Sequence, residues 1–293
     1  MLKSNRGIIL ALTGALLLTP DSLFMRWSAL DGGPMLAWRA TLAGTVFILL
    51  GVIRLLRENV RPSVNVFKFN FWALVFIQIS NASFFAFAIA IAPVAVVLIA
   101  VATVPIISVI LGYLLLGEYA TRKIYITICM VFFGITLSVF GDINTDQFFN
   151  FSTLLGVFFG LAVALSLALN FTIIRKDESL PFEIALGTGG LIAGLSSFVI
   201  FPQAINVSFS SAFYISVTGV FILPVSFFLL SAASRFTSAA NVSIIMLLET
   251  VLGPFWVWLG VNETPSYFAL VGGAIVVTAL AYFLLGKKDP HEL

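Results

Sequence analysis

The chain has 293 residues, of which 60% are hydrophobic and only 10% are charged, and its formal net charge is +2. A soluble domain carries about 25% charged residues to cover its surface, so this composition excludes an ordinary soluble protein and places most of the chain in lipid. The small net charge and the absence of a long basic run argue against a nucleic-acid partner. With one cysteine, Cys129, and one histidine, His291, the chain is not expected to hold a metal, a cofactor or a Cys-His catalytic pair.

Ten apolar stretches follow one another along the chain, each close to the roughly 20 residues that a helix needs to cross a bilayer. They cover residues 7–26, 35–54, 69–91, 93–117, 121–140, 152–174, 182–203, 209–233, 237–260 and 264–286. The first resembles a signal peptide but lacks a small-x-small cleavage site, so we interpret it as a retained helix. The loops are short, so the sequence predicts an all-α membrane protein of ten antiparallel transmembrane helices with no soluble domain.

Basic residues alternate with acidic ones from loop to loop. All but two of the 15 Lys and Arg residues lie before the first stretch, after the last, or in or next to the even-numbered loops between them. The odd-numbered loops carry acidic residues instead, namely Asp31, Asp142, Asp146 and Glu263. Because positive loops stay in the cytoplasm, both termini are expected there, and a bacterial inner (plasma) membrane is the expected location.

The two halves of the sequence share a weak internal repeat. Residues 7–26 align with 156–175, and residues 105–141 align with 250–286. In the second alignment Glu118 falls on Glu263, each at the end of an apolar run. Five helices per half would force the second copy to insert upside down. We therefore expect two inverted repeats, residues 1–146 and 147–293, with a substrate site where they meet near the midplane.

The half-ending segments support a family resemblance. Thr103–Glu118 reads TVPIISVILGYLLLGE, and Leu248–Glu263 reads LETVLGPFWVWLGVNE. With ten helices in two repeats, the whole chain resembles the EamA-type transporters of the drug/metabolite transporter superfamily. Family members usually have Glu-Pro early in the second copy and Gly-Glu at its end, whereas here Thr250 follows Glu249 and Asn262 replaces the glycine. The resemblance implies a secondary transporter whose halves rock about a central site to give alternating access.

Four charged residues of the apolar stretches are not explained by a lipid environment: Asp21, Arg26, Arg39 and Glu249. A charge at the bilayer centre costs about 2.5–3.5 kcal/mol even on the lenient insertion scale. At about 1.5 Å per residue, Asp21 and Arg39 both fall in the outer third of the membrane. We expect them to pair, either as a structural lock or as a gate that releases Arg39 to a substrate. Arg26 lies nearer the surface, where a long side chain reaches water.

Glu249 is the most deeply placed carboxylate, near the middle of the ninth stretch. It would bind a proton or a substrate amine, or else tie helices together by hydrogen bonds. Polar side chains at a similar depth are further candidates, although amides and hydroxyls bridge helices at least as often as they bind ligands. Trp38, next to Arg39, either lines an outer vestibule or belongs to an aromatic belt. The substrate-binding candidates are Arg39, Glu249, Asn81, Thr103, Trp38 and Gln78.

These residues favour transport of a small polar or zwitterionic, amino-acid-like metabolite, a substrate class known in the superfamily. The alternatives are export of lipophilic cations or nucleotide-related metabolites and, less favoured, a membrane-embedded enzyme or a channel. An enzyme would need a cluster of His, Asp or Ser near one interface, and a channel would need filter loops; neither pattern occurs. No P-loop occurs either, so coupling to protons, exchange or the substrate gradient is expected. The expected partners are the small-molecule substrate, the lipid bilayer and protons, for a monomer or homodimer.

Overall fold

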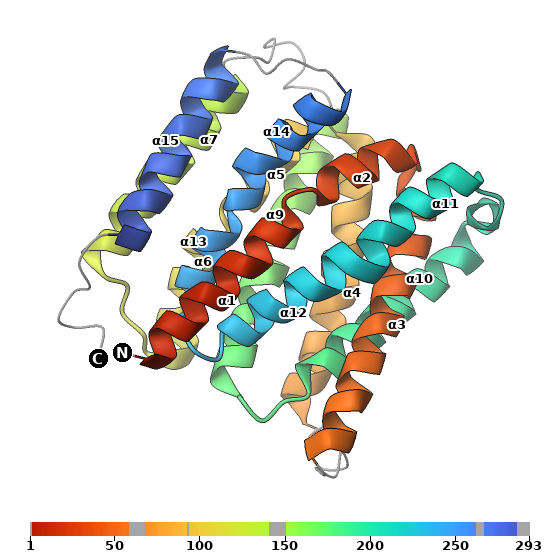
Figure 1. Ribbon diagram of the computed structural model, residues 1–293, viewed down its shortest axis with the longest axis horizontal. Coiled ribbons are helices and arrows are strands. Elements are labelled where there is room, and N and C mark those ends of the chain that lie inside the picture. The colour runs from red at the N-terminus through yellow and green to blue at the C-terminus, as the bar shows by residue number, and fades with distance from the viewer. Residues whose placement is uncertain (1, 59–67, 93, 141–150, 262–266, 286–293) are drawn as a thin grey trace.

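The computed structural model describes residues 2–58, 68–92, 94–140, 151–261 and 267–285, and these residues form a helical bundle without a strand (Figure 1). The elements in chain order are α1 (Leu2–Leu18), α2 (Asp21–Ser28), α3 (Gly32–Glu58), α4 (Phe69–Ile91), α5 (Val94–Val101), α6 (Val104–Leu116), α7 (Arg122–Phe140), α9 (Phe151–Lys176), α10 (Phe182–Ile200), η1 (Pro202–Ile205), α11 (Phe209–Ser216), η2 (Val217–Ile222), α12 (Leu223–Ala233), α13 (Ala239–Met246), α14 (Leu248–Val261) and α15 (Tyr267–Leu285).

Within this part of the chain, eight helical segments are long and apolar enough to cross a membrane. They are Asn5–Ser28, Gly32–Arg57, Phe69–Ile91, Val96–Leu116, Leu154–Lys176, Phe182–Ile200, Phe209–Ala233 and Ala239–Gly260. The predicted fifth and tenth stretches correspond to α7 and to α15, whose apolar part, Leu270–Leu285, is shorter. The all-helical membrane architecture is therefore confirmed, and the count of ten crossings stays a prediction.

The helices run up and down between two ends of the bundle (Figure 1). α1 begins and α15 ends at one end, which we call the N-terminal end, and α2 ends at the opposite end, which we call the far end. α7 packs on α15 at one side of the bundle, and α3 packs on α10 at the other. Between these pairs, α1 packs on α12 and α4 packs on α9.

Three of the long segments are broken near their middles. α1 gives way to α2 at residues 19–20, α5 to α6 at residues 102–103, and α13 to α14 at residue 247. Pro20 and Pro105 lie at or beside the first two breaks, as expected because proline has no N–H to continue the helical hydrogen bonds. A fourth segment, Phe209–Ala233, is also irregular, because it contains the π-helical turn η2, which Pro224 follows. Such turns often occur at functional sites.

α3 and α10 approach one another closely through glycine. A Cβ atom on Gly44 would lie 2.6 Å from the backbone nitrogen of Leu191, and one on Gly187 would lie 2.8 Å from that of Ile48. Small residues allow this approach, which is a common way to gain packing between membrane helices. The contact fixes α3, which carries Arg39, against the rest of the bundle.

Ion pairs and hydrogen bonds join helices at the N-terminal end. Arg54 Nη1 lies 2.6 Å from Oε1 of the buried Glu183, which ties α3 to α10. Arg175 Nε lies 3.1 Å from Glu118 Oε1, and Arg235 Nη2 donates to the Leu180 carbonyl at 2.6 Å. These contacts join α3 to α10 and attach the end of α9 and its connection to α10 to the residues that follow α6 and α12.

Asp177 begins that connection and interacts with a residue from the first half of the chain. Lys68 Nζ lies 3.4 Å from its Oδ2, and the Ser179 hydroxyl donates to its Oδ1 at 2.6 Å. Partial burial alone would raise the pKa of Asp177, but the Ser179 hydrogen bonds together with Lys68 lower this pKa below its ordinary value. The carboxylate therefore stays charged at neutral pH. With 41% of the Lys68 side chain exposed, we expect the pair to add little stability.

Candidate functional site

A cavity lies inside the bundle, about half-way along the helices. Its polar lining consists of Asp21, Arg39, Gln78, Asn81, Glu249 and Thr250, set among leucine, valine, alanine, methionine and phenylalanine side chains. These residues come from helices of both halves of the chain. The centres of water molecules can occupy about 50 Å³ of this cavity. This is space for roughly three to five waters, because each needs about 10–15 Å³ on this measure. A small polar solute is therefore the size of ligand that it suits.

Asp21 and Arg39 form an ion pair in the wall of this cavity. Asp21 is the first residue of α2, directly after the break at Pro20, and its side chain is 1% exposed. Arg39 reaches it from α3, with Nη2 donating to Asp21 Oδ2. The Arg39 side chain is 13% exposed, and its guanidinium carbon lies 5.5 Å from the centre of the Phe85 ring. The sequence predicted this contact from depth alone, while its role as a lock or a gate stays a prediction.

The ion pair leaves polar atoms that a ligand could use. Asp21 Oδ1 and Arg39 Nε are buried and have no hydrogen-bond partner among the residues that the structure describes. An unpaired buried polar atom costs about 1–3 kcal/mol. A polar ligand that reached Arg39 would therefore recover part of this cost.

Glu249 borders the same cavity from α14. It lies in the first helical turn, two residues after the break at Leu247, and its side chain is half-buried. The positive end of the α14 dipole favours a negative group in that turn. No hydrogen bond or ion pair joins Glu249 to another residue in the described ranges. This carboxylate is therefore available to a cation or a proton.

Gln78 and Asn81 also line the cavity, as the sequence suggested from their depth. They lie three residues apart on α4, a spacing that puts both amides on one helix face. Phe85, four residues after Asn81, extends the same face and meets Arg39. Amides accept and donate hydrogen bonds, so this face can orient a polar ligand beside the charged groups.

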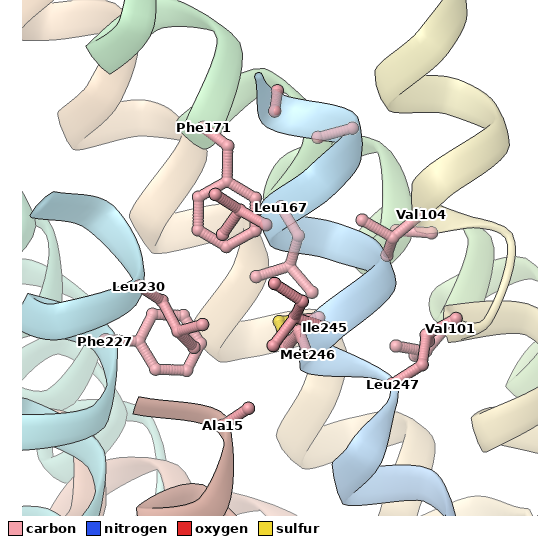
Figure 2. Close-up of a cluster of buried hydrophobic side chains, with 14 of the residues drawn as sticks. Ala15, Val101, Val104, Leu167, Phe171, Phe227, Leu230, Ile245, Met246 and Leu247 are labelled. Atoms are coloured by element: carbon pink, nitrogen blue, oxygen red, sulfur yellow. The ribbon is translucent and has the colours of Figure 1, made fainter. Parts of the chain in front are cut away.

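A large hydrophobic cluster lies next to the cavity (Figure 2). Leu167, Phe227, Met246 and Leu247 line the cavity and belong to this cluster. The cluster continues with fully buried residues such as Phe171. In the same region α13 packs on α6, whereas α14 and α5 show no comparable packing within the described ranges. The two broken segments are therefore joined at the N-terminal end, and their far-end halves make no comparable contact among the described residues.

Known proteins share this architecture. The model of the EamA-like transporter family matches residues 5–140. This part of the chain is therefore similar to the EamA-like transporter family. One crystal structure, titled only "Crystal structure of protein", is 15% identical, with a TM-score of 0.78 over 97% of this chain and 99% of that chain. At that identity it shows the fold alone. No curated protein matches the sequence.

The EamA match confirms the family resemblance that the sequence suggested. It indicates an integral membrane protein that transports small molecules. The matched residues contain Asp21, Arg39, Gln78 and Asn81, which all line the cavity. Glu249 and Thr250 lie outside the match and come from the second half of the chain.

Two of the predicted substrate contacts, Trp38 and Thr103, lie elsewhere. Trp38 is absent from the cavity lining; its indole Nε1 donates to the Ala204 carbonyl at 2.8 Å. Thr103 lies in the break between α5 and α6, and its hydroxyl donates to the Ala100 carbonyl at 2.6 Å. Both side chains donate their hydrogen bonds to backbone carbonyls. The structure therefore gives no support to a role for either in substrate binding.

Several lining residues went unnoticed in the sequence. Three phenylalanines, Phe47, Phe85 and Phe227, supply aromatic walls, and Thr250 adds a hydroxyl beside Glu249. Phe85 shares the helical spacing of Gln78 and Asn81, so periodicity could have identified it. Nothing local distinguishes Phe47 or Phe227 from the many other phenylalanines of an apolar chain.

Proposed function

We propose that this chain is a secondary transporter that moves a small zwitterionic metabolite, of amino-acid type, across a bacterial inner membrane by alternating access. The observation that supports this most directly is that Arg39 and Glu249 border one small buried cavity. A zwitterion carries a carboxylate and an ammonium group on neighbouring atoms, so it can contact both. Apolar and aromatic walls raise the strength of such contacts by excluding water.

In the proposed complex the cargo carboxylate binds Arg39 and the cargo ammonium binds Glu249. A guanidinium presents several N–H donors in one plane and suits a carboxylate well. Asp21 already occupies Nη2 of Arg39, so the cargo shares or displaces this contact. Gln78 and Asn81 hydrogen-bond the remaining polar atoms of the cargo.

The charges of the cavity suggest protons as the coupling ion. Asp21 and Arg39 balance one another, which leaves the negative charge of Glu249. A proton on Glu249 neutralises the empty site, and a cargo ammonium replaces that proton. Because a net charge in the membrane interior is costly, the empty carrier would reorient with Glu249 protonated.

The pattern of helix packing supports two inverted repeats, residues 1–146 and 147–293. If the first five segments map onto the second five, the contact of α4 with α9 corresponds to that of α1 with α12. The α3–α10 and α7–α15 contacts each map onto themselves. The break at residues 102–103 also aligns with that at residue 247. Glu263, which aligns with Glu118 in the predicted repeat, lies outside the described residues.

The same packing suggests which way the site faces. At the N-terminal end α13 packs on α6, and the hydrophobic cluster lies next to the cavity, while α14 and α5 make no comparable contact among the described residues. By the distribution of basic residues, the N-terminal end is cytoplasmic. The arrangement therefore corresponds to a carrier closed to the cytoplasm. In the opposite state α5 and α14 would meet, and α6 and α13 would separate.

Topology can be tested by labelling in a background where the exposed Cys129 is replaced by serine. Single cysteines at Ser208 and at Asp146, which lies outside the described residues, are expected to react with an impermeant maleimide added to intact cells. Cysteines at Arg57, Lys123 and Lys176 are expected to react only after the membrane is opened. Labelling of the first pair only in inverted vesicles would reverse the orientation.

The function can be tested with purified protein in liposomes. We expect saturable counterflow of a neutral L-amino acid such as alanine, with no current that rises linearly with voltage. Lipophilic cations are the competing cargo class, because the cavity has an excess acidic group and three phenylalanines. Counterflow of tetraphenylphosphonium, with no uptake of any neutral amino acid, would contradict the zwitterion proposal. Ohmic current would instead indicate a channel, and chemical conversion of the probe an enzyme.

A further inference from the structure

A second cavity adjoins the first near Arg39. Five residues line both cavities, so the two spaces meet at their side chains: Arg39, Phe47, Gln78, Ala82 and Leu223. The second cavity extends toward Met25 and Met35, which lie near the end of α2 and the start of α3, at the far end. A ligand held at Arg39 therefore lies at the entrance of this second space.

The lining of the second cavity is almost wholly apolar. Arg39 and Gln78 are its polar side chains, and neither Asp21 nor Glu249 contributes to it. Much of its wall is made of small residues at helical spacing: Ala40, Ala43 and Gly44 on α3, and Ala82 and Ala86 on α4. Residues three or four apart share one helix face. Two helices thus present small side chains to one another and leave a hollow between them.

Methionines close this hollow at its outer end. Met25 and Met35 are each 5% exposed and pack with the buried Ile215. A methionine side chain is unbranched and polarisable, so it adapts to ligands of different shape. The hollow has room for about 20 Å³ of water centres, the space of one or two small groups. The second cavity is therefore small, lined mainly by apolar side chains, and able to change shape around a ligand.

We propose that this second cavity is the subsite for the apolar side chain of the cargo. The inference rests on the proposed transport of a zwitterion, whose charged groups occupy the first cavity. With Arg39 in the shared wall, the cargo α-carbon lies beside the opening and projects its side chain into the hollow. The size and lining select a zwitterion with a short, unbranched aliphatic or thioether side chain. A cationic side chain would lose its hydration there without gaining a partner of opposite charge, because this lining contains no carboxylate.

A homologous series of ligands tests the subsite on the intact protein. Glycine, L-alanine, L-2-aminobutyrate, L-norvaline and L-norleucine differ only by successive carbon atoms. Affinity, measured by competition in counterflow, is expected to rise about fourfold per buried carbon over the first two steps, or about 16-fold from glycine to 2-aminobutyrate. It should then level off as the hollow fills. L-Lysine is expected to bind more weakly than norleucine.

Variants that fill the second cavity test whether the cargo side chain binds there. Ala86→Val is expected to reduce the preference for 2-aminobutyrate over glycine from about 16-fold to less than about fourfold. Ala40→Val fills the same space from α3 and serves as a second variant if the first is poorly folded. Ala212→Val makes the same chemical change on α11, at a residue that lines neither cavity, and is expected to keep the wild-type preference.

Three results would overturn the inference. If the series binds with no dependence on chain length, the subsite is wrong while the zwitterion proposal stands. If the dependence is present but survives both filling variants, the side chain binds elsewhere. If no member of the series binds, including glycine, the proposed function is wrong, and the subsite is wrong with it.

Discussion

Glu249→Gln is expected to abolish transport driven by a pH gradient and to weaken binding of a neutral amino acid by about 10- to 150-fold. Glutamine keeps the shape and hydrogen-bonding capacity of the side chain but cannot carry a proton between the two sides. The loss in affinity corresponds to about 1.5–3 kcal/mol for a hydrogen bond to a charged group. Exchange of cargo for cargo is expected to continue at saturating concentration, because it needs no protonated empty carrier.

Glu178→Gln is the matched control for this experiment. Glu178 is exposed in the connection between α9 and α10, so the same chemical change should leave both activities at the wild-type level. The measurement compares uptake into liposomes with and without an imposed pH gradient, followed by counterflow in equal pH. Retention of pH-driven uptake in Glu249→Gln would remove this residue from proton coupling. Loss of counterflow at saturation would indicate a wider defect.

The helical architecture could be predicted from the sequence because a lipid environment places one strict requirement on the backbone. Every backbone group in the hydrocarbon must be paired within its own segment, so long apolar runs become helices. All ten predicted stretches overlap helices of the structure, including 121–140 with α7 and 264–286 with α15. The breaks within the helical segments were harder to predict from the sequence. Pro20 marked a break, whereas Leu247 breaks its segment with no proline or glycine beside it.

The candidate site was only partly readable for a geometrical reason. Counting 1.5 Å per residue gives depth along a helix, but it does not say which face points inward. Gln78, Asn81 and Glu249 were chosen by depth and do line the cavity. Trp38 and Thr103 were chosen partly by depth as well, and their side chains bond to backbone carbonyls instead. Adjacent residues such as Trp38 and Arg39 differ by about 100° around a helix, so one can face the cavity while the other does not.

Burial near a loop was also hidden from the sequence. Glu183 lies at the start of α10, two residues after Pro181, yet its side chain is 1% exposed. Its partner Arg54 lies 129 residues away in the sequence, near the end of α3. The glycines that permit the close α3–α10 contact are visible in the sequence, but their pairing is not. Long-range packing therefore decides which charged residues are buried.

The ion pair of Asp21 with Arg39 gives the largest expected effect on stability. Removing one member of a buried pair leaves an uncompensated charge and costs about 3–5 kcal/mol. Asp21→Asn and Arg39→Gln are therefore each expected to lower the thermal midpoint of the purified protein and its yield in the membrane. The double neutral variant should be more stable than either single variant, because it leaves no unpaired charge in the wall. Thermal unfolding in detergent measures all four proteins.

A charge swap then separates structure from transport. Asp21→Arg combined with Arg39→Asp restores the pair with its members exchanged between α2 and α3. We expect the swap to regain most of the stability lost by Asp21→Arg or Arg39→Asp alone, yet to remain inactive in counterflow of L-alanine. The reason is that the guanidinium would now project from α2 and no longer stand at the wall shared by the two cavities. Arg39→Lys provides an intermediate case, since it keeps the charge but loses the planar donors that suit a carboxylate. If the swapped protein transports at the wild-type rate, the pair is a structural lock and Arg39 does not bind the cargo.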